Sequence, residues 1–148
     1  MSKNVIEVSG EFTRVEHVVG AASIYPGMLC MVNSGDEIVV HTTEGGECEV
    51  LIPMEDVYAG NTVDDVLTDG DRVQCVIPHS GAVFQGLLES GQTVTIGENL
   101  VSAGNGKFIA EDAATSSGVV KKIIGTAREA CDLSGSSAVD TLIKIRRL

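Results

Sequence analysis

The sequence is poor in aromatic residues and has no long hydrophobic run. Only 3% of its 148 residues are aromatic, and Trp is absent. No apolar stretch at the N-terminus has the character of a signal peptide, and no apolar segment reaches the roughly 18 residues of a membrane span. We therefore expect a soluble protein, made in a reducing cytoplasm, with a core of Val, Ile and Leu.

The sequence also lacks the spacings that mark metal and redox sites. Its four cysteines show no CxxC pattern, and none of its three histidines pairs with a cysteine at the spacing of a zinc site. These residues are Cys30, Cys48, Cys75, Cys131, His17, His41 and His79. We expect no metal and no cofactor, and we predict that Cys75 is a buried, reduced thiol on the apolar face of a strand.

Positive charge is missing from a long interval of the chain. No Lys or Arg lies between Arg14 and Arg72, an interval that holds twelve Asp and Glu residues, and the formal net charge is −11. Duplex binding requires several Lys or Arg side chains on one face, so this acidic body argues against a nucleic-acid partner. An acidic surface that maintains solubility is the simpler explanation for any single stretch.

What the sequence does contain is glycine-marked turns and two-residue alternation. In residues 72–78 the apolar Val73, Cys75 and Ile77 fall on one side of the chain, as in a strand with one buried face. Residues 102–108, SAGNGKF, have the Gly and Asn that a tight hairpin needs. We predict that residues 70–108 form one compact antiparallel β unit at the centre of the fold.

Further strands and one short helix complete the expected fold. Strands are predicted near residues 28–32, 37–42, 47–52, 119–130 and 141–147. The helix is predicted over residues 62–67, because Thr62 can cap it and Asp65 stands at a capping-box position. The fold class is therefore all-β, a compact antiparallel barrel-like domain.

The two ends of the chain differ from this body. Residues 1–20 are predicted to form an extended N-terminal arm, which is free in solution or adds as a strand to a partner sheet, and residues 21–148 form a single β domain. A frayed terminus without a role is an equally weighted alternative. At the other end a small basic patch could meet an acidic protein partner, or could simply keep an edge strand soluble. Its residues are Lys121, Lys122, Lys144, Arg146 and Arg147.

From Tyr25 to Leu148 the order of short motifs resembles a known family. The motifs are Pro26–Leu29, His41–Gly46, Asn61–Asp65, Gly70–Val73, Gly91–Gly97, Ser102–Gly106 and Asp132–Ser136. In this order the chain is similar to the capsid cement, or head decoration, proteins of tailed double-stranded DNA bacteriophages.

The resemblance implies a β-tulip or compact barrel and a structural role without enzymatic activity. It implies homotrimers at three-fold and quasi-three-fold positions of the outer capsid surface, bound to the major capsid protein, that stabilise the expanded head. The protein would be made in the host cytoplasm and reside in the virion, with no nucleic-acid or membrane partner. An N-terminal arm would pair with capsid strands. The candidate contact residues of that arm are Lys3, Asn4, Val5, Ile6, Glu7, Val8, Phe12 and Arg14.

Two other functions stay open. Residues 91–100 have the strand-turn rhythm of biotinyl and lipoyl carrier domains, in which Lys107 would be the modified residue, although the usual flanking residues are absent. A small hydrolase could use His79 or His41 as a base. His79 lies next to Ser80, but adjacent residues of a strand point to opposite faces, so they form no catalytic pair.

Overall fold

The computed structural model describes residues 5–56, 59–115 and 120–148. In this part of the chain nearly all regular structure is β, and the one short helix is the 3₁₀ helix η1, Glu111–Ala113. No helix among these residues is long and apolar enough to cross a membrane. The strands are β1 (Glu7–Ser9), β2 (Phe12–Val19), β3 (Cys30–Val32), β4 (Glu37–Val40), β5 (Ile52–Pro53), β6 (Arg72–Pro78), β7 (Val83–Leu88), β8 (Thr93–Val94), β9 (Asn99–Ser102), β10 (Phe108–Ala110), β11 (Gly125–Ala127), β12 (Cys131–Asp132) and β13 (Thr141–Arg147).

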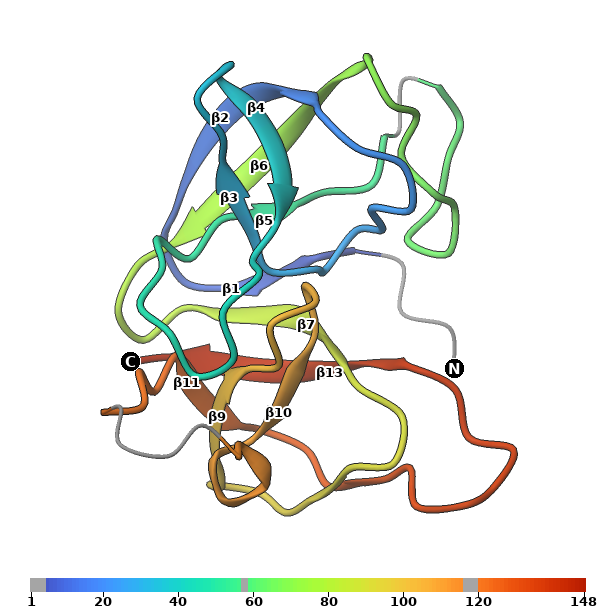
Figure 1. Cartoon of the computed structure of the whole chain (residues 1–148). Coiled ribbons are helices and arrows are strands. Elements are labelled where there is room, and N and C mark those ends of the chain that lie inside the picture. Colours follow the sequence, from blue (N-terminus) through green and yellow to red (C-terminus); the bar gives the residue numbers. More distant parts are fainter. Residues whose placement is uncertain (1–4, 57–58, 116–119) are drawn as a thin grey trace.

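Five strands close into a barrel, which we call the lower barrel (Figure 1). They follow the order β7-β10-β9-β11-β13, and β13 pairs again with β7, while β1 pairs with β7 outside this ring. Strands β9 and β10 form the predicted hairpin, in which Ser102 pairs with Phe108 and Gly104 and Gly106 adopt φ of +82°. The predicted all-β, barrel-like fold class is confirmed.

The remaining long strands form the upper sheet, in the order β3-β4-β2-β6-β5 (Figure 1). A single antiparallel bridge between Cys30 and Leu51 links its two outer strands. The alternation predicted for residues 72–78 holds in the first half of β6, where Val73 and Cys75 are buried and Arg72 is exposed. It fails after Cys75, because Val76 is also fully buried and Ile77 is half-buried. Most pairings are antiparallel, but β2–β4 and β7–β10 are parallel.

Residues 70–108 do not form one unit, contrary to the prediction. Strand β6 pairs with β2 and β5 in the upper sheet, whereas β7 pairs with β13 in the lower barrel. Alternating hydrophobicity shows which face of a strand is buried, but it does not show which strand lies beside it. The chain between β6 and β7 therefore crosses from one half of the molecule to the other.

One hydrophobic cluster runs through both halves. Leu29, Ile52 and Val76 of the upper half and Phe84, Phe108 and Ile145 of the lower barrel all belong to it. The rings of Phe84 and Phe108 lie 6.0 Å apart, centre to centre, in a tilted arrangement. A second cluster lies within the upper half and includes Cys75, whose burial raises the pKa of its thiol to about 12. The prediction of a buried, reduced thiol at Cys75 is confirmed.

The predicted arm is instead part of the folded body, as far as its residues are described. Strand β1 pairs with β7, and β2 pairs with β6 along its length. The side chain of Ile6 has no solvent exposure. Lys3 and Asn4 lie outside the described residues. The strands that pair with β1 and β2 lie far along the chain, at residues 72–88. Nothing local in residues 1–20 therefore indicated this pairing or the burial of Ile6.

The predicted helix at residues 62–67 is a turn. The capping contacts exist, since the Thr62 N–H donates to Asp65 Oδ2 at 2.7 Å and the Asp64 N–H donates to Thr62 Oγ1 at 3.3 Å. The chain does not continue as a helix because the Leu67 N–H donates to the Ile24 carbonyl at 2.8 Å. A tertiary hydrogen bond thus replaces the helical one.

A substitution at Gly125 would test how closely β11 packs against β13 in the lower barrel. A Cβ atom there would overlap the Arg146 carbonyl oxygen and lie 2.8 Å from Ile145 Cγ2, whereas a Cβ on Gly135 would meet nothing within 4 Å. We expect Gly125→Ala to lower the free energy of unfolding by about 2–3 kcal/mol, because backbone must move to admit the methyl group. Gly135→Ala, the matched control, should change it by less than about 0.5 kcal/mol. Chemical denaturation measures both, and equal effects would contradict the close packing of β11 against β13.

Candidate functional site

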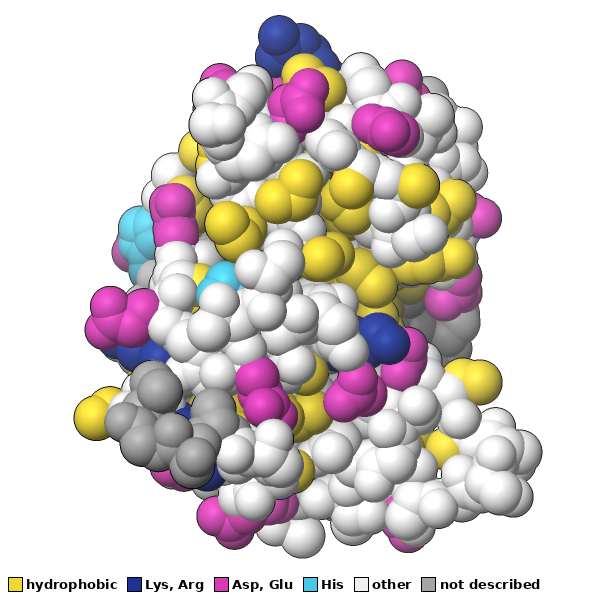
Figure 2. Space-filling model, in the orientation of Figure 1, with side chains coloured by type: hydrophobic (Ala, Val, Ile, Leu, Met, Phe, Trp, Pro, Cys, Tyr) yellow, Lys and Arg dark blue, Asp and Glu magenta, His cyan; other side chains and the backbone are white. Residues whose placement is uncertain are grey.

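A groove of about 830 Å³ opens where the upper half meets the lower barrel. Its walls come from the loop before β3, from β7, and from the start of β13 with the loop before it. Figure 2 shows hydrophobic side chains gathered across the middle of this face of the molecule. The apolar residues that line the groove are Ala22, Tyr25, Pro26, Met28, Val40, Val63, Leu87, Val139 and Leu142.

Part of this apolar surface remains open to solvent. Val139 is 72% exposed and Tyr25 is 37% exposed. Val63 and Leu142, in contrast, are buried beneath the opening. A concave apolar surface that the described residues leave uncovered is typical of a binding site.

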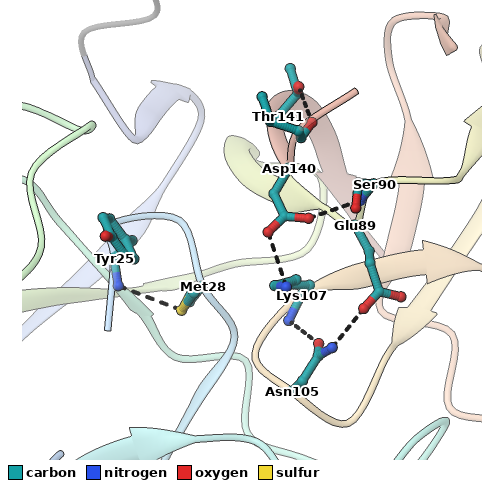
Figure 3. Close-up of polar contacts among 9 residues, drawn as sticks. Tyr25, Met28, Glu89, Ser90, Asn105, Lys107, Asp140 and Thr141 are labelled. Atoms are coloured by element: carbon teal, nitrogen blue, oxygen red, sulfur yellow. Dashed lines mark hydrogen bonds and ion pairs between the residues drawn. The ribbon is translucent and has the colours of Figure 1, made fainter. Parts of the chain in front are cut away.

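A polar network crosses one side of the groove (Figure 3). Lys107 Nζ lies 3.0 Å from Asp140 Oδ2, and Asp140 Oδ1 accepts the Ser90 N–H at 2.8 Å. Beside it, the Asn105 side-chain amide donates to Glu89 Oε1 at 2.6 Å and accepts the Lys107 N–H at 3.1 Å. The network ties the β9–β10 hairpin to the segments before β8 and β13.

The Asp140 carboxylate is stabilised in its charged form. Partial burial opposes the charge, but the Ser90 N–H and the Lys107 ammonium together hold the pKa of Asp140 below its usual value. The same contact bears on the carrier hypothesis, because the Lys107 side chain is only 24% exposed and is paired with Asp140. A carrier lysine must stand free at a hairpin tip, so this geometry disfavours that role.

The structure brings the two parts of the predicted basic patch together. Lys121 and Lys122 precede β11, whose first residue, Gly125, pairs with Arg147 at the end of β13. Two of the five cations are occupied by backbone carbonyls: Lys121 Nζ donates to Glu111 O at 2.9 Å, and Arg147 Nη1 donates to Ile124 O at 3.0 Å. The side chains of Lys122, Lys144 and Arg146 are exposed.

Two of the predicted arm residues that the structure describes, Val5 and Val8, are exposed on or just before β1. Val5 and Val8 are 51% and 40% exposed, although Ile6 between them is buried. Arg14, on β2, makes two hydrogen bonds to the Glu7 carboxylate, at 2.9 and 2.7 Å. This bidentate pair fixes the corner between β1 and β2.

His41 and Ser102 form a buried pair that sequence reasoning missed. His41 Nδ1 lies 2.7 Å from Ser102 Oγ, and His41 Nε2 lies 3.2 Å from the Glu47 carbonyl. Because a carbonyl can only accept, Nε2 carries the proton and Nδ1 accepts from the Ser102 hydroxyl. The Ser102 oxygen also accepts the Gly104 N–H at 3.1 Å. Both side chains are buried, so the pair joins the loop after β4 to the β9–β10 hairpin.

The other two histidines lie apart from this pair. His79 Nε2 lies 2.6 Å from Thr13 Oγ1, and His17 Nδ1 lies 3.8 Å from Asp36. Among the residues that the structure describes, no group of three or more His, Cys, Asp or Glu side chains is placed to hold a metal ion. No sequence signal pointed to the groove either, since its walls come from segments scattered between residues 22 and 142.

Comparison with known proteins finds a likeness in fold. The chain matches no protein-family model and no curated protein sequence. Its structure is similar to the crystal structure of the head fiber gp8.5 N base of bacteriophage phi29, with a TM-score of 0.57 and 14% sequence identity. The alignment covers 93% of this chain and 95% of that chain, so the two share the whole fold.

The Asp140 network gives a prediction for stability against pH. We expect Asp140→Asn to lower the free energy of unfolding at pH 7 by about 1 kcal/mol, because the Lys107 ammonium loses its charged partner. A pKa that is lower in the folded state adds stability above the unfolded value, near 3.9, and this stability is lost as the pH falls through the folded pKa.

Wild type and Asp140→Asn should therefore converge below about pH 4. Denaturant titrations at several pH values measure the difference. Asp69→Asn, at an exposed turn position, is the control. A difference between wild type and Asp140→Asn that stays constant down to pH 3 would contradict the assignment.

Proposed function

We propose that this chain is a structural protein of a tailed-phage virion that binds the outer surface of the capsid as a homotrimer. In this role it contacts the major capsid protein and stabilises the expanded head. The observation that carries the proposal is the end-to-end likeness in fold to the base of a phage head fiber. The order of sequence motifs from Tyr25 to Leu148 also supports it, because that order resembles the head decoration proteins of tailed phages.

The architecture suits a protein that works by covering surface. A shared hydrophobic cluster joins the upper and lower halves. A mechanical force on one half, such as pressure on the capsid, would therefore reach the other half. The groove, the edge at β1 and the basic patch are separate surfaces, and a protein that links neighbours in a shell needs several contacts. The proposal involves no catalysis, no cofactor, no nucleic acid and no membrane.

The edge strand β1 is the surface that we assign to the capsid. It ends the order of its sheet, and among the described residues no strand pairs with its outer edge. Val5 and Val8 present apolar side chains there. A capsid strand could add to this edge with backbone hydrogen bonds and bury both valines. In this proposal the candidate arm residues from Val5 onward act from the folded body.

Capsid binding is the direct test of the proposed function. Capsids of the phage that encodes the chain are prepared without it, in unexpanded and expanded forms, and are sedimented with the purified protein. We expect the protein to co-sediment with expanded capsids in stoichiometric amounts. Capsids that carry the protein should stay intact at a higher temperature, or at a lower ionic strength, than capsids without it. Absence of binding to both forms, with folded protein confirmed by circular dichroism, would refute the proposal.

The β1 edge has its own test. We expect Val8→Lys to weaken capsid binding at least about tenfold, because the edge then carries a charge that the interface would have to desolvate. Ile96→Lys, at a site 64% exposed between β8 and β9, is the matched control and should bind normally. Both variants should keep the thermal unfolding temperature of wild type. Equal binding by the two variants would remove β1 from the capsid contact.

A further inference from the structure

Strand β1 lies between the upper sheet and β7, and few hydrogen bonds hold it there (Figure 1). It pairs with β7 at only two positions, and the register shifts between them. Ile6, the residue before β1, has a side chain without solvent exposure, and its carbonyl accepts the Gln85 N–H at 2.8 Å. A segment held by so few bonds can open locally while the rest of the fold stays closed.

A buried carboxyl group lies against this segment. Glu55 follows β5 and is only 9% exposed, and the backbone N–H groups of Ile6 and of Glu55 itself hydrogen-bond to its carboxyl. Its Oε2 atom is buried and has no hydrogen-bond partner among the described residues. A carboxylate in such a place is strongly disfavoured unless it takes up a proton or gains a partner from water.

The charges that face Glu55 do not balance it. They are Glu7 on β1 and Arg14 on β2, and Arg14 already binds the Glu7 carboxylate with two hydrogen bonds, at 2.9 and 2.7 Å. One guanidinium therefore faces two carboxyl groups. Burial and the charge of Glu7 raise the pKa of Glu55 above its usual value, and the two N–H groups and Arg14 oppose this only in part.

We propose that the contact between Glu55 and Ile6 is a proton-controlled latch for β1. With its proton, the Glu55 carboxyl stays buried against Ile6 and β1 stays on β7. Without the proton, the carboxylate draws water into the contact, and residues 5–9 open while the upper sheet and the lower barrel remain folded.

The segment that opens is β1 because the other side of the contact is held more firmly. The Met54 N–H donates to the Gln74 carbonyl at 2.9 Å, which fixes the backbone before Glu55 to β6. Strand β1 is also the edge that we assign to the capsid. The role of the latch in assembly therefore rests on the proposed function, whereas the opening itself does not.

The direction of the pH effect follows from the linkage between proton binding and opening. Below about pH 4, Glu55 is protonated in both the closed and the open form, so pH does not change their ratio. As the pH rises through the pKa of the closed form, the open form loses its proton first and becomes more populated. Opening of β1 should therefore increase from acidic to mildly alkaline pH.

Amide hydrogen exchange, measured by NMR on the intact protein between pH 4.5 and 8, tests the latch. The Gln85 N–H reports on β1, and the Ile124 N–H, which donates to the Leu100 carbonyl at 2.9 Å, reports on the lower barrel. In wild type we expect the protection factor of Gln85 to fall at least about fivefold with rising pH, while that of Ile124 stays constant. In Glu55→Gln, which cannot ionise, both should stay constant.

Two further variants identify the titrating group. Glu7→Gln removes the repelling charge and leaves Arg14 to Glu55, so the fall in protection should move to lower pH and become smaller. His79 lines the same hollow as Glu7 and Arg14, and histidine is the side chain whose charge ordinarily changes between pH 5 and 8. His79→Gln is therefore the control, and it should show the wild-type fall.

The latch is wrong if Gln85 protection in wild type does not depend on pH, or if Glu55→Gln shows the same fall. An equal fall at Gln85 and Ile124 also overturns it, because the whole fold then opens. Should Glu55→Gln not fold, an unchanged midpoint in Glu7→Gln rejects Glu55 as the titrating group. Capsid co-sedimentation is measured separately on the same variants: failure of all of them to bind refutes the proposed function and leaves the latch standing.

Discussion

The two halves of the molecule depend on strand β7, which is hydrogen-bonded along both edges. On one edge β13 pairs with all six of its residues. On the other, the Gln85 N–H donates to the Ile6 carbonyl at 2.8 Å and the Leu87 N–H donates to the Gly27 carbonyl at 3.0 Å. A lower-barrel strand thus receives its last hydrogen bonds from segments that lead into the upper sheet. Separation of the halves would break these hydrogen bonds, each of which contributes about 0.5–1.5 kcal/mol net to stability.

Close packing around β7 accounts for two glycines. Gly86 lies inside the lower barrel, where an added Cβ would be 2.5 Å from Ile145 and 2.8 Å from Phe108. Gly27 adopts φ of +89° where its carbonyl meets β7, and an added Cβ would overlap Leu142. Only glycine combines that backbone conformation with so close an approach. The groove opens beside this joint, so its shape depends on the packing of the two halves.

Charged side chains are distributed unevenly over the molecule. Asp64, one of the acidic residues of the first half of the sequence, lines the groove, and two cations of the last third, Arg146 and Arg147, lie at the end of β13. Arg14 is held by Glu7 and Lys107 by Asp140, so these two cations serve the fold. Lys122 and Arg146 are exposed, and no ion pair with another described residue is found for either. Surface charge in such a protein sets the orientation of its partners more than the strength of binding.

Much of the local structure could be predicted from the sequence. Alternation identified the buried side of the first half of β6, where Val73 and Cys75 are buried and Arg72 and Gln74 are exposed. Glycine and asparagine identified the β9–β10 hairpin, because positive φ is a property of single residues. The pairing of β1 and β2 could not be predicted, nor could the replacement of the helix at residues 62–67 by a turn. In both places a hydrogen-bond partner from a distant segment outweighs the local preference.

The sequence by itself determined that the chain is all-β, where its tight turns lie, and that its two ends differ in charge. These features depend on neighbouring residues, and neighbours are fixed by the order of the chain. Only the tertiary structure decided that β6 and β7 belong to different halves, that the N-terminal strands lie on the body, and that a groove forms where distant loops meet. Strand pairing and concave surfaces arise from contacts between residues far apart in sequence, and backbone hydrogen bonds carry no side-chain signature that would reveal them beforehand.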